Sequence, residues 1–451
     1  MGVDKNLFLY DLAAVAIMKN EAPYVKEWLD YHLLAGVKHF FIYNNGSPDN
    51  QSEVIQPYID AGLVTYIDYP GQARQYEAYN AAVRDYKFFC RYMAFIDGDE
   101  FIFPKNYKSI VDVTDEVLAD KPNAAALCAN WRFYGSNHQE KFEDRDLTER
   151  FTRCSNGADK HVKSIANPRR IDFFFNPHFA IYFQPYFAVN ERGGEVHDAF
   201  NEPATADKIV INHYYMKSRE EFEGKFQRGT ADAKYNVYTS EMFSHEKYNE
   251  VFDDSILKYR DARKNLLLHN GDIIEIFAEM NFPNYERLLK AVTSNLLPGF
   301  MEDDTKTFFD NPKNRFEYFA MLVKFFSIAP EDFFKGRTEI FLTCLSVSSF
   351  LKDNFVDEEL GSLLEEFSLN ALCKSLSAGV NSYEIRLFVR ELPQILSLPY
   401  PAVNELCSAC FKLIPQLMDT YRIYNAIAWR EFVHMDYILN LLKVFDGYNN
   451  K

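Results

Sequence analysis

The first hundred residues alternate between two kinds of segment, and this alternation constrains the fold more than any other feature of the chain. Short apolar runs predict strands at 12–18, 37–45, 63–69 and 91–97. Apolar residues recur at helical spacing between these runs, at 22–36, 47–62 and 72–90. Strands that alternate with helices form a mainly parallel sheet with helices on both faces. The predicted class is therefore α/β.

The pattern changes twice after this region. From about 124 to 216, aromatic-rich extended runs lie between polar loops, and we expect them to extend the sheet and to form one wall of a cleft. From about 250 onwards, apolar residues at spacings of three and four predict an all-α region. A chain of 451 residues suggests two or three domains. We place an α/β domain at 1–245 and a helical domain at 246–451.

Composition narrows the choice of partners and compartment. The net charge of -16 disfavours a nucleic-acid partner. Seven scattered cysteines indicate reduced thiols in a cytoplasmic protein, and Cys407 and Cys410 are expected to pack in a helix rather than bind metal. The N-terminal segment has neither a signal peptide nor a membrane span, so membrane contact is expected to be peripheral at most. A homodimer through the helical domain is possible.

The segment "YMAFIDGDEFIFP" brings like charges to the end of the fourth predicted strand. Alternate residues of an extended segment face the same way, so Asp97 and Asp99 can converge, and Gly98 leaves room for a ligand near the backbone. Two carboxylates suit Mg²⁺ or Mn²⁺, which also accepts waters and phosphate oxygens. A solvated acidic turn is the commoner role for an isolated D-x-D motif.

Polar residues follow the other predicted strands as well. His213 comes after an apolar run and is a candidate third metal ligand, although a hydrogen-bonded structural histidine is the commoner case. Lys217 is a candidate phosphate contact. Asn20, Glu21, Asn44 and Asn45 end the first two strands, where a nucleotide can bind, but residues of these types also cap helices and form turns.

Several segments in order resemble glycosyltransferase family 92, with its bacterial relatives at the edge of family 2. The resemblance covers about residues 12–230 and rests on "IMKNEAPYVKEWLDYHLLAGVKHFFIYNNGSPD", "MAFIDGDEFIFP", "NWRFYGSNH", "HVKSIANP" and "INHYYMKSREEFEGKFQRG". It implies a GT-A fold and transfer of a sugar, with galactose or another hexose as a guess, from a UDP-sugar to a glycan acceptor. It also implies Mn²⁺ or Mg²⁺ and favours inversion at the anomeric carbon. Bacterial surface polysaccharide or lipopolysaccharide synthesis is the expected setting.

The resemblance assigns roles to individual positions. Metal ligands would be Asp97, Asp99 and His213. The nucleotide and its diphosphate would meet Asn20, Glu21, Asn44, Asn45, Asp97, Lys163 and Lys217. The donor sugar and acceptor would lie against Trp131, Arg132 and His138. Relatives often carry a bulky residue between the two aspartates, so Gly98 leaves the choice of sugar open.

An inverting transfer also needs a group that takes the proton of the acceptor hydroxyl. The candidates are Asp198, Asp172 and Glu143, with Asp144 and His197 as further possibilities, and the sequence does not choose between them. Two other classes of function remain open. One is a non-catalytic GT-A-like binding or scaffold protein, and the other is a metal-dependent phosphohydrolase or nucleotidyltransferase.

Overall fold

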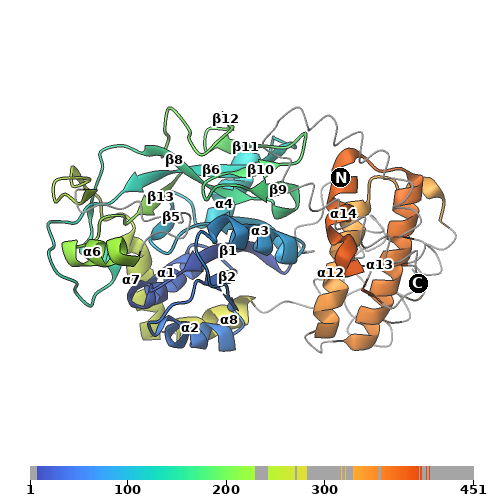
Figure 1. Cartoon of the computed structure of the whole chain (residues 1–451), viewed down its shortest axis with the longest axis horizontal. Helices are drawn as coiled ribbons and strands as arrows, with labels where there is room; N and C mark the ends of the chain where they lie inside the picture. The colour runs from blue at the N-terminus through green and yellow to red at the C-terminus, as the bar shows by residue number, and fades with distance from the viewer. Residues whose placement is uncertain are drawn as a thin grey trace. The chain divides into compact units, whose positions relative to one another are not determined.

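The computed structural model describes residues 8–228, 242–269, 272–281, 329–353 and 357–395, with the separate positions 316, 320, 397, 398, 403 and 406. The chain forms two compact units, one of residues Phe8–Pro283 and one of Asn284–Lys451 with Met1–Leu7 (Figure 1). We describe each unit by itself.

Ten of the described strands form the sheet of the first unit. They are β1 (Tyr10–Met18), β2 (His39–Asn44), β3 (Val64–Asp68), β4 (Cys90–Phe95), β5 (Glu100–Pro104), β6 (Ala124–Phe133), β8 (Asp159–Ala166), β11 (Phe187–Asn190), β12 (Glu195–Val196) and β13 (Ile209–His213). The main path runs β12-β11-β6-β8-β4-β1-β2-β3. Strands β4, β1, β2 and β3 are parallel, β8 is antiparallel between β4 and β6, and β13 joins β6 to β5.

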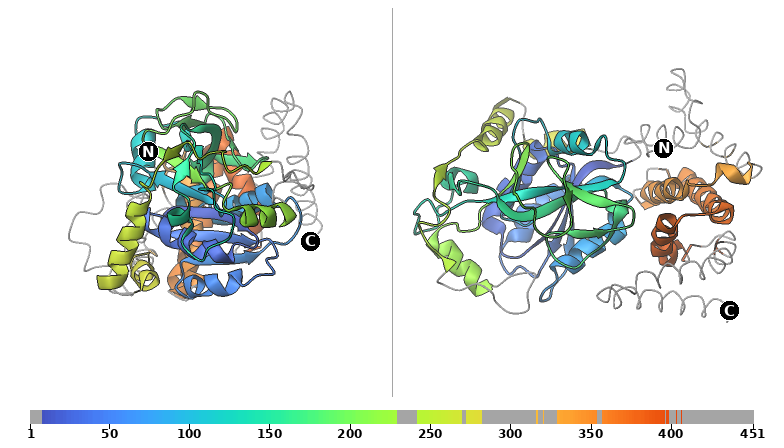
Figure 2. Two further views of the ribbon diagram at one scale, coloured as in Figure 1. Left: turned by 90° about the vertical axis from the view of Figure 1, so that its left-hand side faces the viewer. Right: turned by 90° about the horizontal axis from the view of Figure 1, so that it is seen from above.

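Helices cover both faces of this sheet because consecutive residues of each strand point to opposite sides (Figure 2). In β1, Ala14 and Ala16 belong to one apolar cluster, while Ala13 and Val15 belong to the other. The first cluster includes residues of α1 (Ala22–Leu34), α2 (Gln51–Asp60) and α4 (Ile110–Leu118). The second includes residues of α3 (Gln75–Tyr86) and of the β-hairpin of β9 (Ile171–Phe174) and β10 (Ala180–Tyr182). The mixed, mainly parallel GT-A type of fold is confirmed.

Residues after 245 still belong to this unit. Helix α6 (Arg219–Arg228) precedes them, and β14 (Val251–Phe252) pairs with β7 (Arg153–Cys154). In α7 (Leu257–His269), Tyr259 packs on Tyr31 at 4.9 Å between ring centroids, and Arg263 forms a 2.8 Å ion pair with buried Asp30. Helix α8 (Ile273–Asn281) adds to the same apolar cluster. The compact unit therefore runs to Pro283, not to 245, because α7 and α8 bury their apolar residues against the α1 side of the sheet.

The second unit is helical where the structure describes it. Helices α12 (Thr338–Asp353), α13 (Glu358–Ala378) and α14 (Ser382–Ile395) pack through apolar residues, and Asp357 caps α13 by accepting from the Leu360 amide. Among the described residues, η5 (Glu331–Phe333) is a short helix of this unit, and α5 (Leu147–Arg150) and η2 (Pro168–Arg170) are short helices of the first unit. Cys90, Cys128, Cys154, Cys344 and Cys373 are buried, while Cys407 and Cys410 lie outside the described residues.

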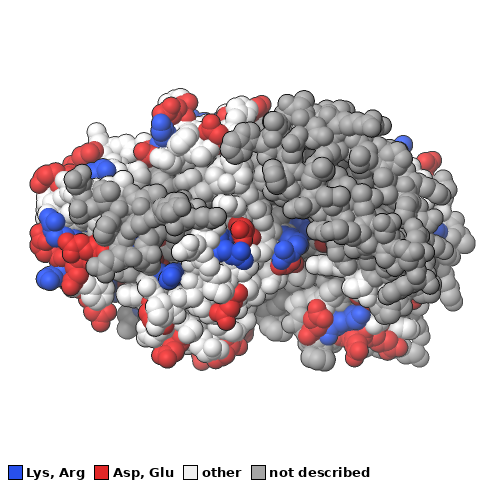
Figure 3. Space-filling view, in the orientation of Figure 1, with Lys and Arg blue, Asp and Glu red and all other residues white. Residues whose placement is uncertain are grey.

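Two surface properties bear on partners. Within the described part of the chain, no helix combines the length and apolar character needed to cross a bilayer. On the face in Figure 3, acidic and basic side chains of the described residues lie next to one another in several places. The overall charge of the chain is nevertheless strongly negative.

Candidate functional site

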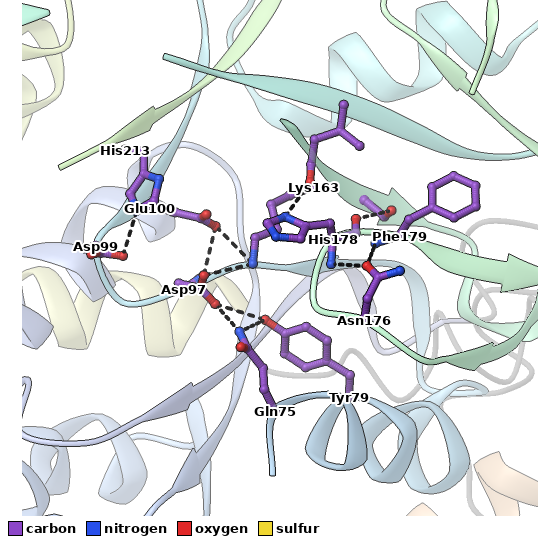
Figure 4. A network of polar contacts seen from close by, with 12 residues as sticks. Gln75, Tyr79, Asp97, Asp99, Glu100, Lys163, Asn176, His178, Phe179 and His213 are labelled. Carbon is purple, nitrogen blue, oxygen red and sulfur yellow. Dashed lines mark hydrogen bonds and ion pairs between the residues drawn. The ribbon is translucent and has the colours of Figure 1, made fainter. Parts of the chain in front are cut away.

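The two aspartates of the D-x-D motif occupy a turn between neighbouring strands. Strand β4 ends at Phe95, β5 begins at Glu100, and the Glu100 amide donates to the Asp97 carbonyl oxygen at 3.1 Å. Because this segment turns, the alternation expected of an extended strand does not apply. Asp97 and Asp99 therefore face different partners (Figure 4).

Asp97 joins a group of side chains from α3 and β8. The Lys163 ammonium donates to Asp97 Oδ2 at 2.9 Å and lies 3.7 Å from Glu100 Oε2. Gln75 and Tyr79, one turn apart on α3, donate to Asp97 Oδ1, the second at 3.3 Å. In Figure 4, Asp97 lies between these α3 side chains and Lys163.

Burial shapes the ionisation of this group. Burial raises the pKa of Glu100 well above its usual value, although Lys163 opposes the rise. Burial disfavours the charged form of Lys163, but Asp97 and Glu100 outweigh this and raise its pKa. Lys163 therefore stays a cation, and its side chain is only 1% exposed. This buried ammonium offsets the negative charge that the Asp97 carboxylate brings to the turn.

Asp99 has a separate pair of partners. Its Oδ2 accepts from Lys225 of α6 at 2.5 Å, and its Oδ1 lies 3.4 Å from His213 Nε2. Burial would raise the pKa of Asp99, but Lys225 and His213 hold it well below the usual range. Burial lowers the pKa of His213, so its imidazole is neutral. Among the described atoms, His213 Nδ1 has no hydrogen-bond partner.

This arrangement fits a divalent ion held by two side chains rather than three. Asp99 and His213 offer a carboxylate and a neutral imidazole next to each other, and Mg²⁺ or Mn²⁺ completes its shell with waters and phosphate oxygens. No group of three His, Cys, Asp or Glu side chains suited to a metal occurs in the described ranges. Asp97, which the sequence predicts to bind the metal together with Asp99, lies with Lys163 instead, because the turn at Gly98 separates the two carboxylates.

A second lysine pairs with a carboxylate after β1. Lys217 Nζ lies 3.7 Å from Glu21 Oε2 and 3.5 Å from the centroid of the Tyr24 ring. Glu21 also borders the D-x-D turn, since a Cβ added at Gly98 would lie 3.3 Å from Glu21 Cγ. The predicted residues Glu21, Lys217 and Gly98 are thus neighbours.

The asparagines at the first two strand ends shape the backbone. The Asn20 amide donates to Ser47 Oγ at 3.0 Å. Asn44 Nδ2 donates to Asp68 Oδ1 at 2.9 Å, and Asn45 Nδ2 donates to the carbonyl oxygens of Tyr69 and Gly71. These bonds fasten the loop after β2 to the end of β3.

The three residues expected along the sugar and acceptor wall are dispersed. Trp131 lies at the site, with its ring centroid 4.4 Å from that of His213. Arg132 points elsewhere, because adjacent residues of β6 face opposite sides, and it forms a 2.7 Å ion pair with Asp253. His138 follows β6 in a loop and has its ring 6.0 Å from that of His245.

The candidate bases also occupy different surroundings. Glu143 is exposed and pairs with Arg145 at 2.8 Å. Asp198 is exposed and accepts from the Phe200 amide at 2.8 Å. Asp172 is buried in β9, and His197 is 75% exposed beside Glu195. The structure does not bring these side chains together with Asp97 and Asp99.

Sequence reasoning overlooked several residues of the site. Gln75 and Tyr79 follow helical spacing of four, and this pattern was available in the sequence. His178 lies beside Lys163 in Figure 4, and burial, followed by the charge of Lys163, lowers its pKa to about 3. Lys225 comes from α6, and no local pattern connects it with Asp99.

Comparison with known proteins places this site within a family. The model of glycosyltransferase family 92 matches residues 14–252. A glycosyltransferase family 92 protein of Ricinus communis is 26% identical over 225 residues, which are 49% of this chain and 38% of that protein. A galactan beta-1,4-galactosyltransferase of Arabidopsis thaliana is 31% identical over 121 residues, 23% of each chain.

One solved structure in the comparison contains UDP. S. aureus TarS in complex with UDP aligns with 85% of this chain at 10% identity, with a TM-score of 0.29, which is too low to carry fold or function across. The stretch matched in the Ricinus communis protein is little more than a third of that protein's length. The family model, by contrast, covers more than half of the sequence and the whole site described above. The chain belongs to glycosyltransferase family 92.

Proposed function

We propose that this protein transfers a hexose from a nucleoside diphosphate sugar, with UDP-sugars first among the candidates, to a hydroxyl of a glycan. One observation carries the proposal. Three largely buried lysines pair with carboxylates around one strand-end turn, as Lys163–Asp97, Lys217–Glu21 and Lys225–Asp99. Ligands of α/β sheets bind outside the carboxyl ends of the strands, and a diphosphate there would meet these ammonium groups.

Asp99 and His213 would hold Mn²⁺ or Mg²⁺ in this proposal. When bound, the ion supplies Lewis-acid stabilisation of the leaving diphosphate. Lys225, which neutralises Asp99 in the described structure, would then be released from the carboxylate and could contact phosphate oxygens. Glu21 and the loop held by Asn44 and Asn45 would border the nucleotide.

The sugar and stereochemistry are proposed from the relatives. The Arabidopsis thaliana relatives are named for a galactan β-1,4-galactosyl transfer. Hexoses in common nucleotide donors are α-linked, so a β product requires inversion at the anomeric carbon. Galactose is therefore the first hexose to test here, with a galactan oligosaccharide as the first acceptor. Synthesis of a surface polysaccharide or lipopolysaccharide in the cytoplasm is our proposed setting.

The test is a transfer assay with the full chain, Mn²⁺ and a panel of UDP-sugars, in which released nucleotide and glycosylated acceptor are measured together. We expect UDP release that depends on the acceptor, and Asp99→Asn is expected to lower it about 10²-fold or more. The matched control is Asp85→Asn, since Asp85 is 31% exposed and pairs with neighbouring Arg84 outside the site. Failure to bind any nucleotide sugar overturns the proposal, and release of nucleoside monophosphate points to a phosphohydrolase or nucleotidyltransferase.

A further inference from the structure

Strand β8 presents a row of polar side chains that leads away from the buried lysine. The pairing of β8 with β6 shifts register opposite Asn130 and Trp131, so contacts rather than strand alternation define this row. Asp159 contacts His161, the His161 ring lies 5.4 Å from that of His178, and His178 lies beside Lys163 (Figure 4). Their exposure rises along the row, because the side chain of Lys163 is 1% exposed while those of His161 and Asp159 are 31% and 33% exposed. The row therefore connects the Asp97 group to the solvent-accessible side of the site.

His161 and Asp159 form an oriented pair. Asp159 Oδ1 accepts from the His161 backbone amide at 2.9 Å and lies 2.5 Å from His161 Nδ1. A carboxylate in this position places the imidazole proton on Nδ1 and leaves the lone pair on Nε2. No hydrogen bond to His161 Nε2 occurs among the described residues. This nitrogen can accept a proton from a bound hydroxyl group.

Aromatic rings surround the imidazole of His161. Trp131 stacks on it at 4.9 Å between centroids, and Phe200, which is 43% exposed, lies edge-on at 4.9 Å. Trp131 also contacts His213 at 4.4 Å. His161 thus stands one aromatic ring away from the Asp99–His213 pair. Trp131 is buried, but the exposed ring of Phe200 beside a polar group suits the apolar face and hydroxyls of a sugar ring.

We infer that His161 is the general base that deprotonates the acceptor hydroxyl, and that Asp159 is the positioning residue that fixes its tautomer. This inference rests on the proposed transferase function. The hydroxyl proton passes to His161 Nε2 while the hydroxyl oxygen forms a bond to the anomeric carbon. The bond from that carbon to the diphosphate oxygen breaks, and its electron pair leaves with the nucleoside diphosphate. His161 then releases the proton to solvent.

The other candidate groups are less suited to this step. His178 has its pKa lowered to about 3 by burial and by Lys163, so it is a weak base. The carboxylates of Glu143 and Asp198 already accept from Arg145 and from the Phe200 amide. Asp172 is buried at 3% exposure in β9. His161 combines exposure, an orienting carboxylate and a place beside Trp131.

The test compares the wild-type full chain with His161→Gln, His161→Ala and Asp159→Asn, using UDP-galactose and a galactan oligosaccharide first and the remaining panel next. UDP binding in the presence of Mn²⁺ is measured by calorimetry alongside transfer. We expect His161→Gln to lower kcat by about 10²- to 10⁴-fold without changing UDP affinity. Added imidazole is expected to restore part of the rate of His161→Ala. Asp159→Asn is expected to lower kcat about tenfold with an unchanged acceptor KM.

The outcomes separate this inference from the proposed function. If wild type transfers sugar and His161→Gln retains a third or more of kcat, the inference is overturned and the transferase proposal stands. A second outcome also overturns the inference: His161→Gln loses both UDP binding and transfer, and imidazole does not rescue His161→Ala. That result would assign His161 a structural role. His197→Gln tests the other candidate histidine. A loss of kcat in His197→Gln but not in His161→Gln would show that His161 is not the base and would overturn the inference. A wild-type protein that binds no nucleotide sugar overturns both proposals.

Discussion

Replacing Lys163 by methionine tests the charge arrangement on which the site depends. The Lys163 side chain is 1% exposed, and its ammonium contacts Asp97 at 2.9 Å and Glu100 at 3.7 Å. Removing one partner of a buried ion pair costs about 3–5 kcal/mol, because a buried charge is left uncompensated. Asp97 is 30% exposed and keeps the donors Gln75 and Tyr79, so the lower end applies. We expect the free energy of unfolding of the first unit to fall by about 3 kcal/mol.

The assay must report on the first unit alone, because a chain of two units does not unfold in a single two-state step. The chain has three tryptophans, Trp28 and Trp131 in the first unit and Trp429 outside the described residues. In a Trp429→Phe background, tryptophan fluorescence therefore follows only the first unit. A loss of about 3 kcal/mol corresponds to a fall in Tm of about 6–12 °C for a unit of this size.

Lys160→Met is the matched control. Lys160 lies on the same strand, its side chain is 47% exposed, and it is 3.8 Å from the exposed carboxylate of Glu202. Exposed pairs of this kind contribute about 0–1 kcal/mol, so the control is expected to keep its Tm within a few degrees. Equal losses in the two variants, or a loss below about 1 kcal/mol for Lys163→Met, would refute the argument that Lys163 neutralises a buried carboxylate cluster.

Three further predictions concern pH, metal and the D-x-D turn. Burial, then repulsion by Asp146, raises the pKa of Glu27 from 4.5 to about 7, so the folded state keeps a proton that the unfolded state releases between these pH values. As pH rises from 4.5 to 7, the free energy of unfolding of the wild type should fall by about 3 kcal/mol relative to that of Glu27→Gln, and it should then level off. Parallel profiles of Tm against pH for the two proteins would contradict this. Lys225→Met should strengthen binding of Mn²⁺ alone about tenfold, measured by electron paramagnetic resonance, because the charge-assisted hydrogen bond to Asp99 no longer competes. Gly98→Ala should lower the free energy of unfolding by at most about 1 kcal/mol. It should nevertheless weaken UDP binding, because the new Cβ would lie 3.3 Å from Glu21 Cγ and displace that side chain. An unchanged UDP affinity, measured by calorimetry, would count against a role for Glu21.

The sequence alone determined the secondary structure of the sheet and the position of the site along it. All four strands and three helices predicted between 12 and 97 form, with ends that differ by a few residues. These elements can be predicted from the sequence because each has its own periodic spacing of apolar residues and is ended by residues that disfavour its continuation. The same logic placed Asp97, Asp99, His213 and Glu21 at strand ends, where ligands of such sheets bind.

Tertiary structure alone decided which of these groups touch. Asp97 and Asp99 are two residues apart, yet one pairs with Lys163 of β8 and the other with Lys225 of α6. The packing of α7 on α1 and the stacking of Trp131 on His161 arise in the same way. Such contacts join residues far apart in sequence, and their distances depend on how strands and helices pack rather than on any local period. The chain's pattern therefore places the charges at one edge of the sheet, and only packing determines which charge neutralises which.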